Sequence, residues 1–462
     1  MRVHVLTAIG IVAAAGCAGS GTGTAGGSAP TGDRAALATR IDEIVSEPIK
    51  AGKAAGGSIA VIKGGDTIAV KGFGMANVEL GVPTMPGAIY EIGSITKQFT
   101  GAAVMQLVEQ GKLSLDDDIR KHLPSYDTKG RKITVRQLLD HTSGIKGYTE
   151  MPEARDLFAK QLPRDTLVKL FSKRPLEFEP GDEQIYNNSA FFLAGLIIER
   201  VSGMSYEDYV QKNLFDRAGM KDSHYCSERK IHKNKVTGYD TDSSGMVQRG
   251  PISHQWPYAA GSLCASAVDL ARWNQALHRD GKILGPEAYQ EFIKADTLNS
   301  GVRLGYAKGI AVTDRLGRRA LHHGGGINGF LSENIYFPDD SLTVVVLFNT
   351  AGPASPDELA LKIAEQVLGP TKVAALGFEG DLNAFAGTYA GLGRGQSMEV
   401  TVTADNGRLT AKLPFADSAK ALTYIGENTF LQDETKFIFG EHNGRSTLRI
   451  DAGYGNNLLV KK

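Results

Sequence analysis

Ser94 and Lys97 lie three residues apart in EIGSITKQFTGAAVMQLVEQGK, the stretch from Glu91 to Lys112. Its apolar residues recur at helical spacing and Gly111 ends the pattern, which predicts an amphipathic helix. Positions i and i+3 share a helix face, so the amine of Lys97 can reach Ser94 Oγ. The helix N-terminus adds backbone N–H groups and partial positive charge, which stabilise an oxyanion. The pair could act as nucleophile and base if burial and nearby positive potential keep Lys97 neutral.

Ser-x-x-Lys is a short pattern, and the chain contains it three times. The copy at Ser227 lies in the charged run SERKIHKNK, and the copy at Ser143 is interrupted by Gly144 and Gly147, which disfavour a regular helix. For Ser94 taken alone, a serine helix cap followed by a solvated lysine is the commoner explanation. Other motifs must decide between the two interpretations.

Two further pairs of residues have types suited to chemistry. Tyr186 and Asn188 precede FFLAGLIIERVSG, an apolar segment that predicts a helix. His323 and Gly325 lie in LHHGGGINGF, and a second pair with the same spacing begins at His322. The glycines there would let a ligand approach the backbone closely, but they also suit a plain turn.

Several other residues have simpler explanations. Copies of the same two pairs begin at Tyr454 and His442, where turns between short strands account for them. Asp140, His141 and Ser143 are expected to brace a helix-to-loop turn rather than to react. The sequence contains no Gly-x-Ser-x-Gly elbow, no His-Glu-x-x-His motif and no Gly-x-x-x-x-Gly-Lys-Ser/Thr loop. We therefore expect neither a metal nor an organic cofactor.

The composition is that of a soluble globular protein. The chain has 462 residues, more than one typical domain of about 100–200 residues requires. Hydrophobic residues make up 42% and charged residues 22%. The 51 basic and 51 acidic side chains balance, which gives no electrostatic reason to expect a nucleic-acid partner.

The N-terminus has the pattern of a targeting segment. Residues 1–17, MRVHVLTAIGIVAAAGC, combine Arg2, an apolar run and small residues, as a signal peptide does. The final Ala-Ala-Gly-Cys resembles a bacterial lipoprotein cleavage site with Cys17 as the lipid-bearing residue, and plain secretion is the alternative. Residues 18–32 are rich in Gly, Ser and Thr and predict a flexible linker. The expected location is periplasmic, free or membrane-anchored.

The order of elements predicts a mixed α/β fold followed by an all-β module. A helix is expected over 34–49, then a hairpin around Gly64-Gly65-Asp66, and strands return between 320 and 349. Helical patterns fill the region between, so early and late strands could share one antiparallel sheet flanked by helices, with a helical insert. Residues 381–462 have the pattern of short alternating strands and predict an all-β module of the small-barrel type.

Taken in chain order, these motifs resemble the penicillin-recognising serine hydrolases, specifically the class C β-lactamase-related branch with its D-aminopeptidases and esterases. The blocks that carry the resemblance are ITVRQLLDHTSGI (133–145), YNNSAFFLAGLIIERVSGMSYEDYV (186–210), LFDRAGMKDSHY (214–225), AAGSLCASAVDLARW (259–273) and HGGGINGF (323–330). A lone serine cap predicts none of them. The resemblance implies a β-lactamase/transpeptidase-like hydrolase domain over 33–370. Residues 381–462 resemble the lipocalin-like C-terminal domain of some relatives.

The resemblance also implies catalytic roles. Ser94 would be the acylated nucleophile and Lys97 its base. Tyr186 would act as general base or acid, and Asn188 would bind the substrate amide or position Lys97. His323 would stand where many relatives carry the lysine of Lys-Thr/Ser-Gly.

His323 is preferred to His322 because the interval from His323 to Phe330 matches the family spacing. The backbone N–H groups of Ser94 and Gly326 would form an oxyanion hole, and Gly325 would contact the substrate.

Histidine at this position affects the expected substrate. It is mostly neutral near pH 7, so His323 is a weaker carboxylate anchor than lysine. Esters, or amides and peptides with a free amino group, therefore fit better than β-lactams or D-Ala-D-Ala peptides. A β-lactamase or carboxypeptidase, an acyltransferase and a non-catalytic cell-wall peptide-binding protein remain alternatives. Cys226 and Cys264 could form a disulfide or stay as buried thiols.

Overall fold

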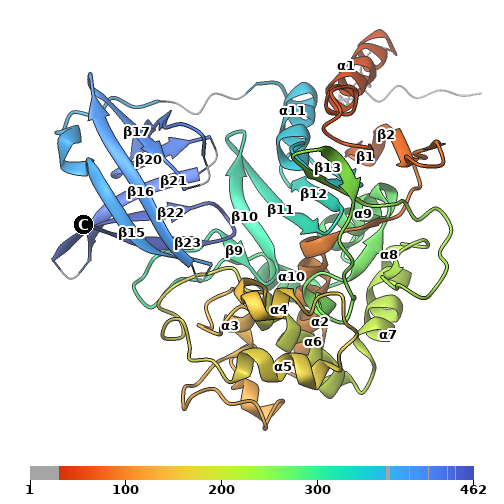
Figure 1. Cartoon of the computed structure of the whole chain (residues 1–462), viewed down its shortest axis with the longest axis horizontal. Helices are drawn as coiled ribbons and strands as arrows, with labels where there is room; N and C mark the ends of the chain where they lie inside the picture. The colour runs from red at the N-terminus through yellow and green to blue at the C-terminus, as the bar shows by residue number, and fades with distance from the viewer. Residues whose placement is uncertain (1–30, 371–374, 395, 415, 434, 443) are drawn as a thin grey trace, which may run out of the picture.

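The structure is a computed structural model that describes residues 31–370, 375–394, 396–414, 416–433, 435–442 and 444–462 (Figure 1). The expected signal peptide, Cys17 and residues 18–30 of the expected linker lie outside these ranges. No helix among the described residues is both long enough and apolar enough to cross a bilayer.

The larger unit is built on an eight-stranded antiparallel sheet in the order β3-β2-β1-β13-β12-β11-β10-β9. Early strand β1 pairs with late strand β13, with Val61 opposite Val344. This pairing confirms that strands from both ends of the region form one sheet. The strands are β1 Gly56–Lys63, β2 Asp66–Asn77, β3 Val82–Pro83, β9 Tyr306–Ala307, β10 Ile310–Arg315, β11 Arg318–Ile327, β12 Phe330–Phe337 and β13 Leu342–Phe348.

Helices cover both faces of this sheet (Figure 1). α1 (Thr31–Lys50) and α11 (Pro356–Leu368) pack on one face, where apolar residues of both helices meet those of β1, β12 and β13. The Ser355 side chain caps α11, as its sequence predicts. α1 begins at Thr31, ahead of the expected start at Arg34, so the last two residues of the expected linker belong to the helix.

The other face carries α9 (Ala267–Asn274) and the helical insert, whose largest core surrounds α2 (Thr96–Glu109). α2 was expected to be amphipathic, and that prediction is wrong, because every residue from Thr96 to Leu107 is buried. Its polar side chains find internal partners: Thr100 Oγ1 donates to Ala259 O at 2.6 Å. The remaining helices are α3 Val135–Leu139, α4 Pro152–Arg155, α5 Arg164–Ser172, α6 Asn188–Ser202, α7 Tyr206–Val210, α8 Asp216–Ala218 and α10 Pro286–Phe292.

Two small sheets complete the larger unit. β4 (Tyr90–Glu91), β8 (Leu263–Ala265) and β5 (His224–Tyr225) form one of them, and a disulfide joins Cys226 to Cys264 beside it. This bond decides between the two states left open for these cysteines. The other small sheet contains β6 Tyr239–Asp242, β7 Gly245–Gln248 and β14 Thr350–Ala351.

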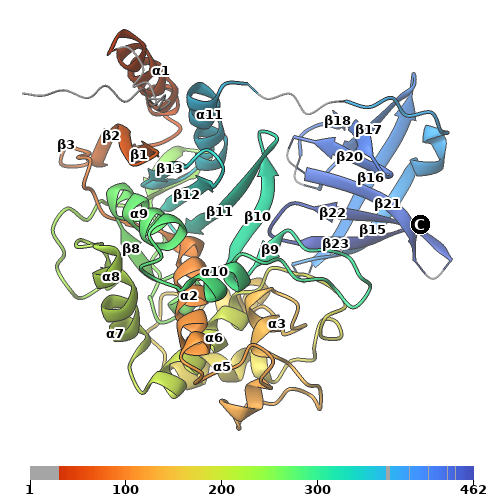
Figure 2. The ribbon, with the colours of Figure 1, turned by 180° about the vertical axis from the view of Figure 1, so that it is seen from behind.

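The C-terminal part forms a nine-stranded, nearly closed antiparallel barrel in the order β18-β17-β16-β15-β23-β22-β21-β20-β19, with its own apolar core. This confirms the expected all-β module. The barrel stands beside the β9–β10 edge of the large sheet (Figures 1 and 2). Its strands are β15 Gly387–Gly393, β16 Gln396–Asp405, β17 Arg408–Lys412, β18 Lys420–Ala421, β19 Thr423–Gly426, β20 Thr429–Gln432, β21 Thr435–His442, β22 Arg445–Asp451 and β23 Asn456–Lys461.

Candidate active site

Ser94 lies on a 3-10 turn (Gly93–Ile95) immediately before the buried helix α2. The backbone of Ile92 donates to Leu263 O at 3.0 Å, which fixes the entry to this turn. Gly93 has a φ of 51°, and a Cβ there would lie 2.9 Å from Gly326 N. Only glycine therefore lets the turn come this close to strand β11.

Lys97 is the second residue of α2 and fully buried, and its amine has three oxygen neighbours. Lys97 Nζ lies 3.2 Å from Ser94 Oγ, 2.8 Å from Asn188 Oδ1 and 2.9 Å from Ala260 O. Asn188 Oδ1 and the Ala260 carbonyl can only accept hydrogen bonds. A neutral amine would give them its two N–H groups and keep its lone pair for the Ser94 hydroxyl proton.

The electrostatic surroundings favour that neutral amine. Burial lowers the pKa of Lys97 well below its usual value, and the positive charge of Arg394 lowers it further. The negative charge of Glu150 opposes both effects.

Tyr186 and Asn188 are positioned by the start of α6. Asn187 caps this helix through its side chain, which accepts from Ala190 N at 2.9 Å. Asn188 Nδ2 donates to Thr149 Oγ1 at 3.1 Å, which leaves Oδ1 facing Lys97. Burial raises the pKa of Tyr186, and an interaction with Ser94 offsets this only in part, so its phenol is protonated. The Lys97 amine lies 4.6 Å from the Tyr186 ring centroid.

His141 braces the segment that carries Tyr186. It has a φ of 64°, its Nδ1 accepts from Asn187 N at 3.1 Å, and its carbonyl accepts from Ile185 N at 3.1 Å. Its ring packs against that of Tyr186 with 4.5 Å between centroids. The structure thus places His141 as a support of the turn, as expected from its position in the sequence.

Asp140 and Ser143 also lie in this turn. The Asp140 carbonyl accepts from Gln184 Nε2 at 3.0 Å, and Ser143 Oγ accepts from Ile145 N at 3.4 Å.

His323 faces the same site from β11, and its ring centroid is 6.2 Å from that of Tyr186. Its Nδ1 lies 2.6 Å from Gly324 O, a pure acceptor, so Nδ1 carries the proton. Nε2 then accepts from the Tyr306 hydroxyl at 2.9 Å. Burial lowers the pKa of His323 well below its usual value, and the charge of Lys97 lowers it further. His323 is therefore a neutral imidazole.

Two glycines of β11, Gly325 and Gly326, have different roles beside Ser94. A Cβ on Gly325 would lie 2.1 Å from Ile92 O, so this residue serves close packing and is not part of the lining of either cavity beside Ser94. Gly326, in contrast, lines both cavities together with Ser94 and Asn188.

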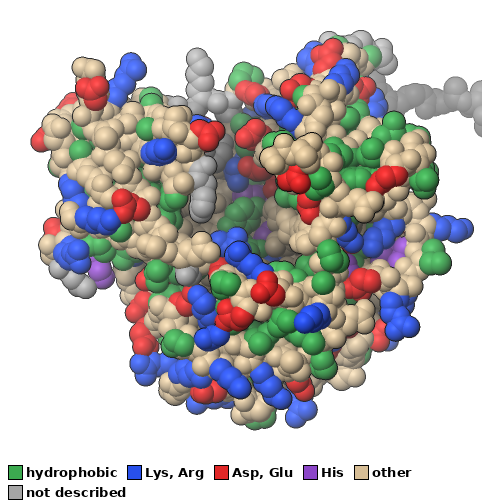
Figure 3. Space-filling view, viewed as in Figure 1, with side chains coloured by type: hydrophobic (Ala, Val, Ile, Leu, Met, Phe, Trp, Pro, Cys, Tyr) green, Lys and Arg blue, Asp and Glu red, His purple; other side chains and the backbone are tan. Residues whose placement is uncertain are grey.

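Ser94 lies between these two cavities. The larger, of about 390 Å³, is also lined by Tyr186, His323 and five residues of the C-terminal part, which are Arg394, Ala452, Tyr454, Gly455 and Asn457. The smaller, of about 140 Å³, is lined largely by apolar and aromatic side chains, including Phe158, Ile252, Trp256 and Ile327. Figure 3 shows the surface hollowed between the barrel and the larger unit.

Sequence reasoning missed the residues that the barrel contributes to this site. Tyr454 was explained as part of a turn, yet its hydroxyl accepts from Gly324 N at 2.7 Å, next to His323. Arg394 lies in a turn after β15, and nothing in its local sequence indicates that it reaches Glu150. The repeated Tyr-x-Asn pattern was the one available signal for Tyr454.

The comparisons with known proteins agree with this geometry. The beta-lactamase family model matches residues 41–368. Protein flp of Staphylococcus aureus (strain N315) is 28% identical over 320 residues, which cover 67% of this chain and 62% of the relative. Penicillin-binding protein 4* of Bacillus subtilis (strain 168) is 28% identical over 328 residues, 68% of this chain and 72% of the relative. The chain thus spans less than two thirds of Protein flp.

Solved structures extend the similarity. An octameric penicillin-binding protein homologue from Pyrococcus abyssi superposes with a TM-score of 0.65 at 28% identity, over 92% of this chain and 99% of that one. A D-stereospecific amidohydrolase from Streptomyces sp. gives a TM-score of 0.62 at 25% identity, over 73% of this chain and 99% of that one. The fold and the family match define the class: the chain belongs to the beta-lactamase family.

Proposed function

We propose that the protein cleaves esters or small amides and peptides through an acyl-enzyme on Ser94. Ser94 Oγ attacks the substrate carbonyl while its proton passes to Lys97 Nζ. The N–H groups of Ser94 and Gly326 stabilise the resulting oxyanion, and Tyr186 O–H protonates the leaving oxygen or nitrogen. The proton on Lys97 then passes to the Tyr186 oxygen, so both groups regain their starting state. Water attacks the acyl-enzyme as its proton passes to Lys97 Nζ, and this proton is given to Ser94 Oγ as the acid leaves.

One observation carries this proposal: the buried Lys97 amine contacts the Ser94 hydroxyl while two pure acceptors, Asn188 Oδ1 and Ala260 O, occupy its other directions. A solvated lysine beside a helix cap would have no reason to be fully buried. The arrangement fits an activated serine nucleophile.

The cavities suggest the substrate class. The smaller one suits a short apolar group on one side of the carbonyl, and the larger one suits a polar group near Arg394 and Tyr454. His323 is neutral and offers no fixed cation for a β-lactam carboxylate. We therefore favour short-chain esters and amides of D-amino acids, the latter supported by the similarity to a D-stereospecific amidohydrolase.

The test is hydrolysis of p-nitrophenyl butyrate and D-phenylalanine amide by the protein and its Ser94→Ala variant. Loss of the nucleophile should lower kcat by several orders of magnitude. Mass spectrometry after a rapid quench should show an added butyryl group on a peptide containing Ser94. Equal rates in both proteins, or an acyl group on another residue, would refute the assignment.

We also propose that the protein acts at the cell envelope, anchored through lipid on Cys17. This rests on the signal-peptide pattern of residues 1–17 alone. Radiolabelled palmitate should label the wild type but not the Cys17→Ala variant when both are made in a bacterium that processes lipoproteins. Labelling of neither would leave plain secretion as the better explanation.

A further inference from the structure

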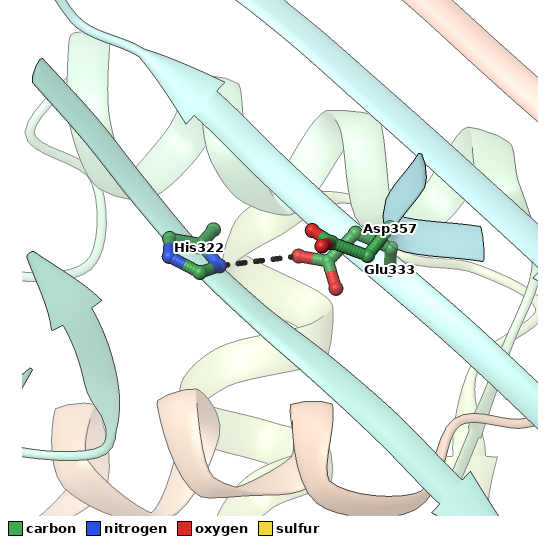
Figure 4. Close-up of side chains that lie close together, drawn as sticks. All are labelled: His322, Glu333 and Asp357. Atoms are coloured by element: carbon green, nitrogen blue, oxygen red, sulfur yellow. Dashed lines mark ion pairs between the residues drawn. The ribbon is translucent and has the colours of Figure 1, made fainter. Parts of the chain in front are cut away.

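Three side chains with metal-binding atoms meet on the side of β11 away from the candidate active site. His322 lies on β11, Glu333 on β12 and Asp357 in the first turn of α11. One ligand atom from each lies within 4.8 Å of the other two. Figure 4 shows the His322 imidazole facing the two carboxylates. His322 is adjacent to His323 in sequence, but successive strand residues point to opposite faces, so it faces away from Ser94.

Each of the two carboxyl groups has one buried oxygen without a hydrogen-bond partner among the described residues. Glu333 is 2% exposed, and its Oε1 has no hydrogen-bond partner among the described residues. Asp357 Oδ1 is also buried and has none in that part of the chain. A buried carboxyl oxygen without a partner is unfavourable, because no hydrogen bond replaces those that it makes to water in the unfolded chain. The arrangement therefore calls for a positively charged or donating group between the two acids.

Two contacts connect the members of the cluster and their neighbours. Arg315 Nη1 lies 3.3 Å from Asp357 Oδ2. His322 Nδ1 lies 3.4 Å from Glu333 Oε1, and the two atoms face each other without a hydrogen bond between them.

The hydrogen bonds of His322 fix its tautomer in the form that a metal requires. Tyr454 O–H accepts from Gly324 N at 2.7 Å, which leaves its own proton for His322 Nδ1 at 3.1 Å. The other nitrogen, Nε2, lies 3.0 Å from Thr313 Oγ1 and donates to it. Nδ1 therefore carries the lone pair, which accepts from Tyr454 O–H when no ion is bound and would bind an ion beside the carboxylates in place of that hydrogen bond. Thr313 would then act as the outer partner that metal-bound histidines generally have.

We propose that His322 Nδ1, Glu333 Oε1 and Asp357 Oδ1 bind a divalent cation of the zinc type. Imidazole nitrogen with carboxylate oxygens is a donor set that Zn²⁺ accepts readily, whereas Mg²⁺ and Ca²⁺ prefer oxygen alone. Three protein ligands leave a fourth position for water. A cavity of about 650 Å³ that both Asp357 and Tyr454 line gives the ion a path from solvent.

The sequence offers no sign of this site because its ligands come from β11, β12 and α11 and share no local spacing. A bound ion would connect these three elements beneath Tyr454, the barrel residue that also binds Gly324. Its role is therefore structural, and it would hold the barrel contact in place without taking part in the chemistry at Ser94.

The experiment uses the whole chain, purified without a polyhistidine tag and dialysed against EDTA. Isothermal titration with Zn²⁺ should show one ion per chain, and Zn²⁺ should raise the Tm of the wild type. Co²⁺ should give the visible absorption of a four-coordinate complex. The Glu333→Gln and Asp357→Asn variants, which keep side-chain size, should each weaken Zn²⁺ binding at least tenfold and lose the rise in Tm.

The matched control is His122→Gln, because His122 is another buried histidine beside a carboxylate, at 3.0 Å from Asp117, and does not belong to the cluster. This variant should bind Zn²⁺ like the wild type. The proposal is overturned if wild type shows no one-to-one Zn²⁺ binding at micromolar concentration. It is also overturned if the Glu333 and Asp357 variants bind Zn²⁺ as tightly as the wild type, or if Mg²⁺ or Ca²⁺ binds in preference to Zn²⁺.

Discussion

The guanidinium of Arg394 lies 2.9 Å from the Glu150 carboxylate, and this ion pair joins the C-terminal barrel to the helical insert at the mouth of the candidate active site. The same guanidinium lies 5.2 Å from the Tyr186 ring centroid. The two charges have opposite effects on the pKa of Lys97: Arg394 lowers it and Glu150 raises it. The barrel therefore contributes to the protonation state of the proposed base.

Replacing Arg394 by glutamine should shift the acidic limb of the pH profile of kcat/KM to higher pH. Lys97 must be neutral to accept the Ser94 proton, so activity rises as pH passes through the pKa of Lys97. Loss of the Arg394 charge, with Glu150 left unpaired, raises that pKa. Ester hydrolysis measured across the acidic limb tests this. Arg408→Gln, an exposed change on the same barrel, is the control. An unchanged limb, or one moved to lower pH, would contradict the role of Arg394.

Lys97→Arg should be as inactive as Lys97→Ala. A guanidinium keeps the positive charge but cannot become neutral, so it cannot accept a proton from Ser94. Both variants should lose about 10²- to 10⁴-fold in kcat, the usual contribution of a general base. Lys146→Arg, in another Ser-x-x-Lys copy whose lysine pairs with Glu177, should keep full activity. Substantial activity in Lys97→Arg would show that position 97 has to provide a positive charge and not a neutral amine that accepts the Ser94 proton.

The sequence predicts those parts of the site that local patterns encode. Ser94 lies in the 3-10 turn that leads directly into α2, where Lys97 follows, and Tyr186 and Asn188 lie at the start of α6, so local spacing brings the members of each pair together. The pairing of early and late strands was predictable because both have apolar runs typical of buried strands, and the region between them has mainly helical patterns. The burial of α2 on all sides was not predictable, because its polar residues depend on partners such as Ala259 that lie far away in sequence.

The contribution of the barrel could not be predicted for a similar reason. Tyr454 and Arg394 reach the site only because the barrel packs beside the β9–β10 edge (Figure 2). Gly325 was expected to contact the substrate, but its place against Ile92 follows from how closely the serine turn approaches β11. Both features are set by tertiary packing, which residue spacing does not contain.

Tyr306→Phe should lower activity by its effect on His323. The change removes the hydroxyl that donates to His323 Nε2 and leaves this buried nitrogen without a partner. We expect the free energy of unfolding to fall by about 1–3 kcal/mol. Because the ring is no longer held, kcat/KM should fall roughly ten- to a hundredfold.

Tyr289→Phe is the matched control for this change, because the Tyr289 hydroxyl lies 3.0 Å from His278 Nδ1, away from Ser94. It should lower stability to a similar degree and leave kcat/KM unchanged. If Tyr306→Phe and Tyr289→Phe lower kcat/KM equally, the loss in Tyr306→Phe comes from lower stability and not from the position of the His323 ring.

The disulfide between Cys226 and Cys264 should stabilise the β5–β8 region that backs the serine turn. The two cysteines are separated by 38 residues, and closing a loop of that length in the unfolded chain corresponds to roughly 3–4 kcal/mol. The double variant Cys226→Ala/Cys264→Ala should therefore have a Tm several degrees lower.

Adding dithiothreitol should lower the Tm of the wild type by a similar amount and leave the Tm of the double variant unchanged. Equal Tm values for both proteins without reductant would mean that this bond adds nothing to stability. Activity at 25 °C should persist in the double variant, because neither sulfur contacts Ser94 or Lys97. The carbonyl of Ala260, which accepts from Lys97 Nζ, belongs to the 3-10 turn Tyr258–Ala260, and neither cysteine lies in that turn.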